Sequence, residues 1–280
     1  MKIQSAGRLG NILFIWAYAL NHAINGKNNN VEIFADKYHT SIDESLIDTF
    51  QKLSSKEVKL NVDNKIGLIL KALDKITQFM PNQSQVIRQK FRIQSEDLDS
   101  MSDNAWIQRG YFQNAMYFED CQEEIHRRLI EIIRDTVVTA QLMLRFPFLV
   151  YEYQAIHVRL SDFIGSNAGV IDLESQIKCL DKNLKTVICT DGTKSEILSM
   201  ISLQDFEIIT PDESTAWETI AILSGAKVFI SSNSTLSWWS GFIAAGNGAK
   251  VWIPKIWNKT LLSPKPLPFS HVLTYIPNFV

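Results

Sequence analysis

The sequence predicts an α/β protein built from two Rossmann-like units, each with a mostly parallel sheet. Short β-type runs alternate with helical patterns along the chain, which is typical of parallel strands joined by helical crossovers. A length of 280 residues suits one large or two modest domains. An apolar stretch with a proline at 146–150 marks a candidate boundary. We therefore expect units at 1–148 and 149–280, facing each other across a cleft.

Composition excludes several classes of protein. Lys plus Arg number 28 and Asp plus Glu number 30, so the net charge of −2 argues against a dedicated nucleic-acid binder. No apolar run approaches the ~20 residues that a membrane span needs. The opening MKIQSAGRLG contains no apolar signal segment and is expected to be a strand. The three cysteines are scattered without metal-binding spacing, which is typical of reduced thiols in a cytoplasmic protein.

The first half is expected to begin with a strand, a glycine-containing turn and a buried helix. The run ILFIWAYALNHAIN is apolar on nearly every side, so it should lie against a sheet, and Gly26 suits its C-terminal cap. The pattern of residues 82–104 is polar and irregular and gives no assignment. The other elements expected here are strands at 1–5, 31–35 and 105–111 and helices at 64–80 and 116–135.

The second half is more regular, and it predicts one Rossmann-like unit with parallel strands and helical crossovers. Strands are expected at 153–158, 186–190, 206–209, 227–231 and 250–253. Helices are expected at 173–183, 193–202, 214–224 and 235–245.

Ligands of open α/β sheets bind beyond the carboxyl ends of the strands, so the residues at those ends are candidate site residues. After the first strand comes GRLGN, with Gly7, Gly10 and Asn11. Glycines allow a tight turn and a close approach to the backbone, and the following helix N-terminus suits an anion. The spacing is not GxGxxG, so an ordinary strand-to-helix turn is the alternative.

The segment IHVRLSDF follows the first strand of the second half. Arg159 could clamp a pyrophosphate with two parallel hydrogen bonds and stabilise charge on a departing phosphate. Asp162 could accept a proton or orient Arg159. The alternative for the segment, which also contains His157, is a buried salt bridge that closes a strand end.

Two later strand ends also carry polar residues. Asp191 could accept hydrogen bonds from N1–H and N2–H₂ of guanine, and the alternative is an Asp-Gly turn. The next polar group could cap the following helix or bind phosphate. The tryptophan pair 238–239 is expected to pack in the core, because its helix is apolar all round. The members of the polar group are Ser232, Asn233, Ser234 and Thr235.

Six segments in order resemble motifs of the α1,2-, α1,6- and protein O-fucosyltransferase superfamily, and most closely the bacterial α1,2-fucosyltransferases (glycosyltransferase family 11). GRLGNILFIWAYAL resembles the family's GGLGNQLFQYAFA, RGYFQNAMYFED its G-Y-x-Q-x-x-x-Y-F, and HVRLSDF its H-x-R-R-G-D-Y. CTDGTKSE resembles S-D-D, FISSNSTLSWWSGFIA resembles I-S-N-S-T-F-S-W-W-x-A-W-L, and WIPKIW resembles A-P-x-x-W. The resemblance covers roughly residues 3–257. Two of the departures from the motifs matter for the site: Leu160 replaces the second arginine and Gly192 the second acid.

The resemblance implies a GT-B-like fold, GDP-fucose as donor, inversion at the anomeric carbon and no metal or other cofactor. It implies catalytic roles for Arg159 on the leaving diphosphate and for Asn11, which would reach across the cleft to the donor. Asp162 would be the base for the acceptor hydroxyl or an orienting residue. The residues expected to bind the donor are Gly10, His157, Asp191, Ser232, Asn233, Ser234 and Thr235.

The function implied is transfer of L-fucose to a galactoside, at the 2-OH of galactose, in surface polysaccharide or O-antigen synthesis. The alternatives are a transferase for another GDP-sugar and a non-catalytic nucleotide-sugar-binding homologue. The expected partners are GDP-fucose and a galactose-terminated oligosaccharide, with no nucleic acid. We expect a cytoplasmic protein that can associate peripherally with the inner face of the membrane through a lipid-linked acceptor.

Overall fold

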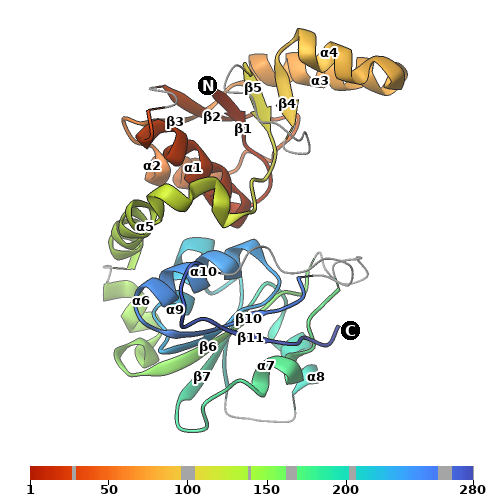
Figure 1. Ribbon diagram of the computed structural model, residues 1–280. Coiled ribbons are helices and arrows are strands. Elements are labelled where there is room, and N and C mark those ends of the chain that lie inside the picture. The colour runs from red at the N-terminus through yellow and green to blue at the C-terminus, as the bar shows by residue number, and fades with distance from the viewer. Residues whose placement is uncertain are drawn as a thin grey trace. The chain divides into compact units, whose positions relative to one another are not determined.

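The computed structural model describes residues 1–26, 30–95, 105–137, 140–161, 169–201, 206–257 and 267–279. The chain forms two compact units, Met1–Ile125 and His126–Val280 (Figure 1). The division falls ahead of the stretch 146–150, at which the sequence analysis placed the boundary. Each unit contains an open sheet of parallel strands with helices, and this confirms the predicted α/β fold class. None of the helices in the described ranges is both long and apolar enough to cross a membrane.

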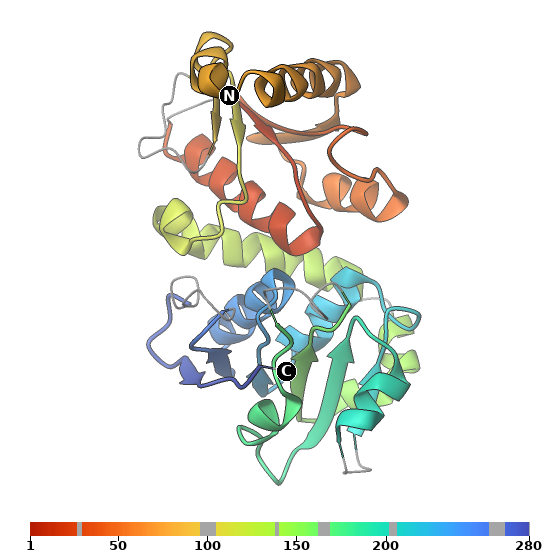
Figure 2. The same ribbon diagram turned by 90° about the vertical axis from the view of Figure 1, so that its right-hand side faces the viewer.

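The first unit holds a parallel sheet with the strand order β3-β2-β1-β5-β4. In Figure 1 α3 and α4 lie side by side and extend away from these strands, and in Figure 2 this side of the unit faces the viewer. The strands are β1 Lys2–Gln4, β2 Val31–Ala35, β3 Val58–Val62, β4 Ile93–Ser95 and β5 Ile107–Arg109. The helices are α1 Leu9–Ile24, α2 Glu44–Leu53, α3 Asn64–Phe79, α4 Ser84–Lys90 and α5 Gln122–Val137, with 3-10 turns η1 Pro81–Gln83 and η2 Ala115–Cys121; α5 continues into the second unit.

Helix α1 is the central packing element of this unit. Nearly all of its residues from Leu9 to His22 are buried, as the all-round apolar pattern predicted. Gly26 follows the C-cap Asn25 with a φ of 70°, a left-handed conformation that favours glycine, and the predicted helix end is confirmed.

The second unit holds a parallel sheet with the order β11-β10-β9-β6-β7-β8. All five predicted strands are present, and β11, which the sequence analysis missed, extends the sheet. The strands are β6 Tyr153–Val158, β7 Lys185–Thr190, β8 Phe206–Ile209, β9 Val228–Ile230, β10 Lys250–Pro254 and β11 Leu273–Tyr275. The helices are α6 Ala140–Arg145, α7 Leu173–Ile177, α8 Lys194–Met200, α9 Ala216–Ser224 and α10 Thr235–Gly246, with the 3-10 turn η3 Pro147–Val150.

Strand order places a topological switch point in each sheet. In the second unit the chain runs from β6 to β7 and β8 on one side, and β9, β10 and β11 lie on the other side of β6. In the first unit β2 and β3 lie on one side of β1, and β5 and β4 on the other. Ligands of open α/β sheets bind at the carboxyl ends of the strands that flank a switch point. The carboxyl ends of β6 and β9, and those of β1 and β5, are therefore the candidate ligand-binding positions.

Candidate functional site

A buried hydrogen bond joins the two strands at the switch point of the second unit. His157 in β6 and Ser232 after β9 are both almost fully buried, and His157 Nδ1 lies 2.9 Å from Ser232 Oγ. Gln176 of α7 donates from Nε2 to the carbonyl oxygens of His157 (3.0 Å) and Ser231 (3.3 Å). The structure therefore brings together residues 75 positions apart, which the sequence analysis assigned separately to the donor site.

His157 is held in its neutral form. Burial lowers the pKa of its imidazole to about 4, and the nearby Asp191 carboxylate offsets this only in part. The contact with Ser232 is consequently a hydrogen bond between neutral groups, since a protonated ring here would carry a buried charge.

Arg159 and Asp191 form an ion pair between the ends of β6 and β7. Arg159 Nη1 lies 2.8 Å from Asp191 Oδ2. The other carboxylate oxygen, Oδ1, accepts the backbone N–H groups of Leu160 (2.6 Å) and Ser161 (3.3 Å), and the Ser161 hydroxyl donates to Oδ2. Burial raises the pKa of Asp191, but these hydrogen bonds and Arg159 outweigh it, so the pKa lies below its ordinary value. The site thus contains a fixed carboxylate and a fixed guanidinium.

This ion pair differs from the one that the sequence analysis considered. The candidate partner of Arg159 was Asp162, which lies outside the described residues, whereas the observed partner is Asp191 from the next strand. Asp191 already accepts hydrogen bonds at both oxygens, so a guanine base would have to share or displace these donors. Its guanine contact stays a prediction.

The two departures from the family motifs contact each other. Leu160 is fully buried in the core of this unit. A Cβ placed on Gly192 would lie 2.6 Å from Leu160 Cδ1 and 2.9 Å from Glu196 Oε2. A side chain at position 192 would therefore require Leu160 to move. The side chain of the leucine fits beside the glycine, and Leu160 contacts the ion pair of Arg159 only through its backbone N–H, which donates to Asp191.

The polar segment after β9 leads into α10 without capping it. Ser234 is the N-cap of α10, and its side chain makes no capping hydrogen bond. Ser237 Oγ instead accepts the N–H of Ser232 at 2.9 Å. Asn233 is almost fully buried; its Nδ2 donates to Gly169 O at 3.1 Å, while its Oδ1 has no hydrogen-bond partner in the described part of the chain. Side-chain capping, the alternative reading of this segment, is thus not observed at Ser234.

The paired tryptophans belong to the core, as expected. Trp238 and Trp239 expose 2% and 0% of their surface, with ring centroids 5.0 Å apart. Phe242 stacks on Trp238 in the next turn of the helix. A sugar could not reach either indole face, so the packing role is confirmed.

In the first unit, the turn after β1 contacts the turn after β5. Gly7 has a φ of 77°, and a Cβ there would lie 2.2 Å from Asn11 Nδ2. Gln113 donates from Nε2 to Asn11 Oδ1 at 2.9 Å. Gln113 was not predicted as a site residue, although it lies in the segment RGYFQN, which resembles a family motif. Gly10 and Asn11 lie in the first turn of α1, at this unit's switch point.

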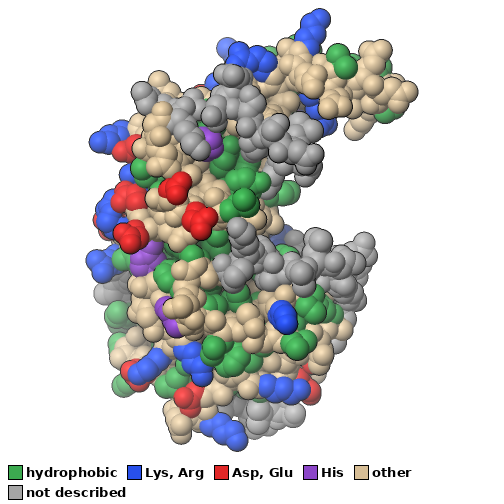
Figure 3. Space-filling model, viewed as in Figure 1, with side chains coloured by type: hydrophobic (Ala, Val, Ile, Leu, Met, Phe, Trp, Pro, Cys, Tyr) green, Lys and Arg blue, Asp and Glu red, His purple; other side chains and the backbone are tan. Residues whose placement is uncertain are grey.

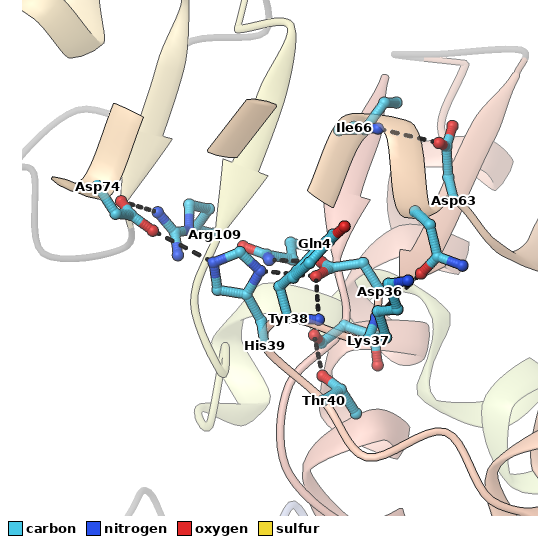
Figure 4. Close-up of polar contacts among 12 residues, drawn as sticks. Gln4, Asp36, Lys37, Tyr38, His39, Thr40, Asp63, Ile66, Asp74 and Arg109 are labelled. Carbon is cyan, nitrogen blue, oxygen red and sulfur yellow. Dashed lines mark hydrogen bonds and ion pairs between the residues drawn. The ribbon is translucent and has the colours of Figure 1, made fainter. Parts of the chain in front are cut away.

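A second polar group in the first unit, which we call the strand-end cluster, was not predicted (Figure 4). It consists of Gln4, Asp36, His39, Asp74 and Arg109. Asp36 accepts from Gln4 Nε2 (3.0 Å) and lies 2.7 Å from His39 Nδ1. His39 Nε2 lies 3.3 Å from Asp74 Oδ2, and Arg109 Nη1 donates to Asp74 Oδ1 at 2.8 Å. These residues come from β1, the turn after β2, α3 and β5.

The strand-end cluster is fully buried at Asp36 and partly exposed at His39, Asp74 and Arg109, which we call its rim. Asp36 is fully buried, whereas the side chains of His39, Asp74 and Arg109 are 19%, 30% and 23% exposed. Burial raises the pKa of Asp74, but Arg109 and His39 outweigh it, so the pKa lies below its ordinary value. Gly67 allows α3 to approach, because a Cβ there would lie 2.3 Å from Asp36 Cβ. The rim thus offers charged donors and acceptors at the carboxyl edge of the sheet.

Two other features lie elsewhere. In the described residues, no group of three or more His, Cys, Asp or Glu side chains is arranged to hold a metal ion. A surface pocket of about 560 Å³ is lined by residues that include Lys2, Glu32 and Trp106. These residues lie at or near the amino ends of β1, β2 and β5, the edge opposite to the one where parallel sheets bind ligands.

Comparison with known proteins shows similarity in fold only. No protein-family model and no curated protein sequence matches the chain. The α-1,6-fucosyltransferase NodZ of Bradyrhizobium, co-crystallised with GDP, is 14% identical over 86% of this chain and 92% of its own, with a TM-score of 0.49. The E. coli heptosyltransferase WaaC with ADP is 12% identical over 98% and 92%, also with a TM-score of 0.49. A glycosyl transferase of family 9 from Veillonella parvula is 8% identical over 98% and 85%, with a TM-score of 0.47.

Proposed function

We propose that the chain is an inverting fucosyltransferase that transfers L-fucose from GDP-fucose to the 2-OH of a galactoside. The observation that carries the proposal is the meeting of His157, Arg159, Asp191 and Ser232 at the carboxyl ends of β6, β7 and β9. These residues come from three segments that resemble fucosyltransferase motifs, and β6 and β9 flank the switch point at which such sheets bind ligands.

In this proposal Arg159 stabilises the negative charge that grows on the leaving diphosphate. Its guanidinium is held by Asp191, so it needs little rearrangement during the reaction. Helix α10 begins at Thr235, and the side chain of its N-cap residue Ser234 makes no capping hydrogen bond. The N-terminus of this helix would bind the diphosphate. Asn233 adds a buried amide oxygen, and Asn11 contacts the donor from the first unit.

The first unit would bind the acceptor. The rim of the strand-end cluster offers His39, Asp74 and Arg109 for hydrogen bonds to sugar hydroxyls. Asp162 remains our candidate for the base that accepts the hydroxyl proton, or for a residue that orients its neighbours. Replacing Asp74 with Asn should raise the acceptor KM severalfold and leave GDP binding unchanged.

Donor choice tests the proposal directly. The purified chain should turn over GDP-fucose with a galactose-terminated oligosaccharide in preference to GDP-mannose, UDP-galactose and an ADP-sugar. Titration calorimetry should show tighter binding of GDP than of UDP or ADP. Preference for GDP-mannose would favour the second candidate, a transferase for another GDP-sugar. GDP binding without turnover of any donor would favour the non-catalytic homologue, and equal affinity for all three nucleotides would remove the guanine assignment.

We further propose that transfer needs no metal ion, because cationic side chains and helix ends can neutralise the diphosphate. Turnover should persist in EDTA, with manganese or magnesium giving at most a modest gain through capture of released GDP. Complete loss of turnover in the chelator, restored by manganese, would contradict this. In the cell, the enzyme would work on surface polysaccharide precursors at the inner face of the membrane.

A further inference from the structure

The segment 64–92 carries an unusual excess of positive charge. It contains six cationic side chains, Lys65, Lys71, Lys75, Arg88, Lys90 and Arg92, and one acid, Asp74, so its net charge is 6 − 1 = +5 in a chain whose net charge is −2. Asp74 is itself bound by Arg109. The segment comprises α3, η1, α4 and the two residues that follow α4, and we call it the α3–α4 hairpin.

The same hairpin exposes large apolar side chains. Helix α3 buries one stripe, formed by Ile66, Leu70, Leu73 and Thr77. A second stripe at the helical spacing of 69, 72, 76 and 79 faces away from the core: Ile69 and Ile76 are each 45% exposed and Phe79 is 86% exposed. Other exposed apolar side chains of the hairpin are Leu68, Met80, Val86 and Phe91.

Charge and apolar surface occur together on this extension. Figure 3 shows blue Lys and Arg side chains and green hydrophobic side chains on it, and no red side chain in that view. Phe79 and Met80 stand at the tip, immediately before the turn at Pro81. An apolar face flanked by lysine and arginine is typical of helices that lie in the interface of a membrane. A contact between two copies would instead bring two strongly positive surfaces together.

We propose that the α3–α4 hairpin docks the protein on an anionic lipid surface, with Phe79 and Met80 inserted at the headgroup boundary and the lysines bound to lipid phosphates. Each basic residue near an anionic bilayer adds to binding, and long lysine side chains can reach the headgroups while their stems cover apolar surface. The inference does not depend on the identity of the donor sugar. It assigns a lipid partner to the apolar stripe of α3 that stays exposed among the described residues.

Vesicle flotation of the full chain tests the proposal. The protein should float with vesicles that contain phosphatidylglycerol, bind much less to pure phosphatidylcholine, and dissociate as salt rises. The variant Phe79→Ser/Lys75→Glu should bind the anionic vesicles about tenfold more weakly, since it removes one inserted ring and reverses one charge. Both side chains are exposed, so the fold and the turnover of a soluble acceptor should not change.

A matched control replaces one large apolar side chain with serine and one lysine with glutamate on the second unit, at Leu144 and Lys182, both of which are exposed. Leu144→Ser/Lys182→Glu should bind vesicles like wild type. Equal binding to neutral and anionic vesicles, or equal loss in the two double variants, would overturn the proposal. A dimer that dissociates in Phe79→Ser/Lys75→Glu, without vesicle binding by wild type, would show that a second copy covers this surface instead.

Discussion

At the scale of single residues, Arg159 should be the most sensitive position for turnover. Arg159→Ala should lower kcat by about 10²–10³, since a preorganised donor to a developing charge contributes roughly 3–4 kcal/mol. Arg159→Lys should be nearly as poor, because one ammonium cannot reproduce a two-pronged contact. Turnover and melting temperature should be measured on the same preparations.

The Arg159–Asp191 ion pair supplies the control for that experiment. Asp191→Asn breaks the same ion pair but leaves the guanidinium in place. If Arg159 acts on the diphosphate, Asp191→Asn should lose less turnover than Arg159→Ala at a similar loss of stability. Equal losses of turnover and stability in both variants would reduce Arg159 to a structural role.

Asp191 has two proposed roles, and a change of base separates them. A carboxylate that reads guanine would bind N1–H and N2–H₂, so it would favour GDP over inosine diphosphate, which lacks the amino group. The carboxylate is instead occupied by Leu160, Ser161 and Arg159. If Asp191 acts only by holding Arg159, Asp191→Asn should lower kcat and leave the ratio of the GDP and inosine diphosphate affinities unchanged in calorimetry. If Asp191 reads guanine, the ratio should collapse in the same variant.

At the scale of elements, the turn between β1 and α1 can be tested with two glycines. Gly7 and Gly26 both have positive φ, but a Cβ would meet Asn11 only at Gly7, while Gly26 has nothing within 4 Å. Alanine at either position should cost about 1–2 kcal/mol of backbone strain. Only Gly7→Ala should also displace Asn11 from Gln113, so only this variant should lose turnover beyond its loss of stability. Equal turnover in the two variants would remove Asn11 from the site.

Elements with a strong apolar period could be predicted from the sequence, and those stabilised by tertiary contacts could not. Helices α1 and α10 match their predictions within a few residues, because burial on nearly all sides leaves long apolar runs. Strands β6 and β8 also match, as short segments rich in β-branched and aromatic residues. Strand β3 was missed: it reads VKLNV and buries chiefly Val58. Helix α2 was missed as well, although its N-cap Asp43 accepts the N–H of Leu46, a local signal that could have found it.

The site shows the same limit. Sequence reasoning could select Arg159, Asp191 and Ser232, because each follows a predictable strand. It could not show that Arg159 pairs with Asp191, since that contact depends on which strands become neighbours in the sheet. The strand-end cluster was missed for the same reason: Asp36, Asp74 and Arg109 are far apart in the chain and meet only in the folded unit.

At the scale of the whole molecule, one buried histidine should make stability depend on pH. The pKa of His157 falls from 6.5 to about 4 on folding, because burial disfavours the imidazolium. Between these values the unfolded chain binds a proton that the folded chain does not, so stability present above pH 6.5 is lost as the pH falls toward 4. The melting temperature should accordingly decrease from pH 7 to pH 5.

A variant separates this effect from that of the acids. The pKa values of Asp74, Asp191, Glu32 and Glu213 lie below their ordinary range in the folded protein, so these carboxylates lose stabilising contacts only at lower pH. His157→Asn removes the titrating ring and keeps a polar group opposite Ser232. It should melt lower than wild type at pH 7, but its melting temperature should change less between pH 7 and pH 5. An unchanged slope would mean that the pH dependence comes from other groups, and that His157 does not stay neutral in the folded protein.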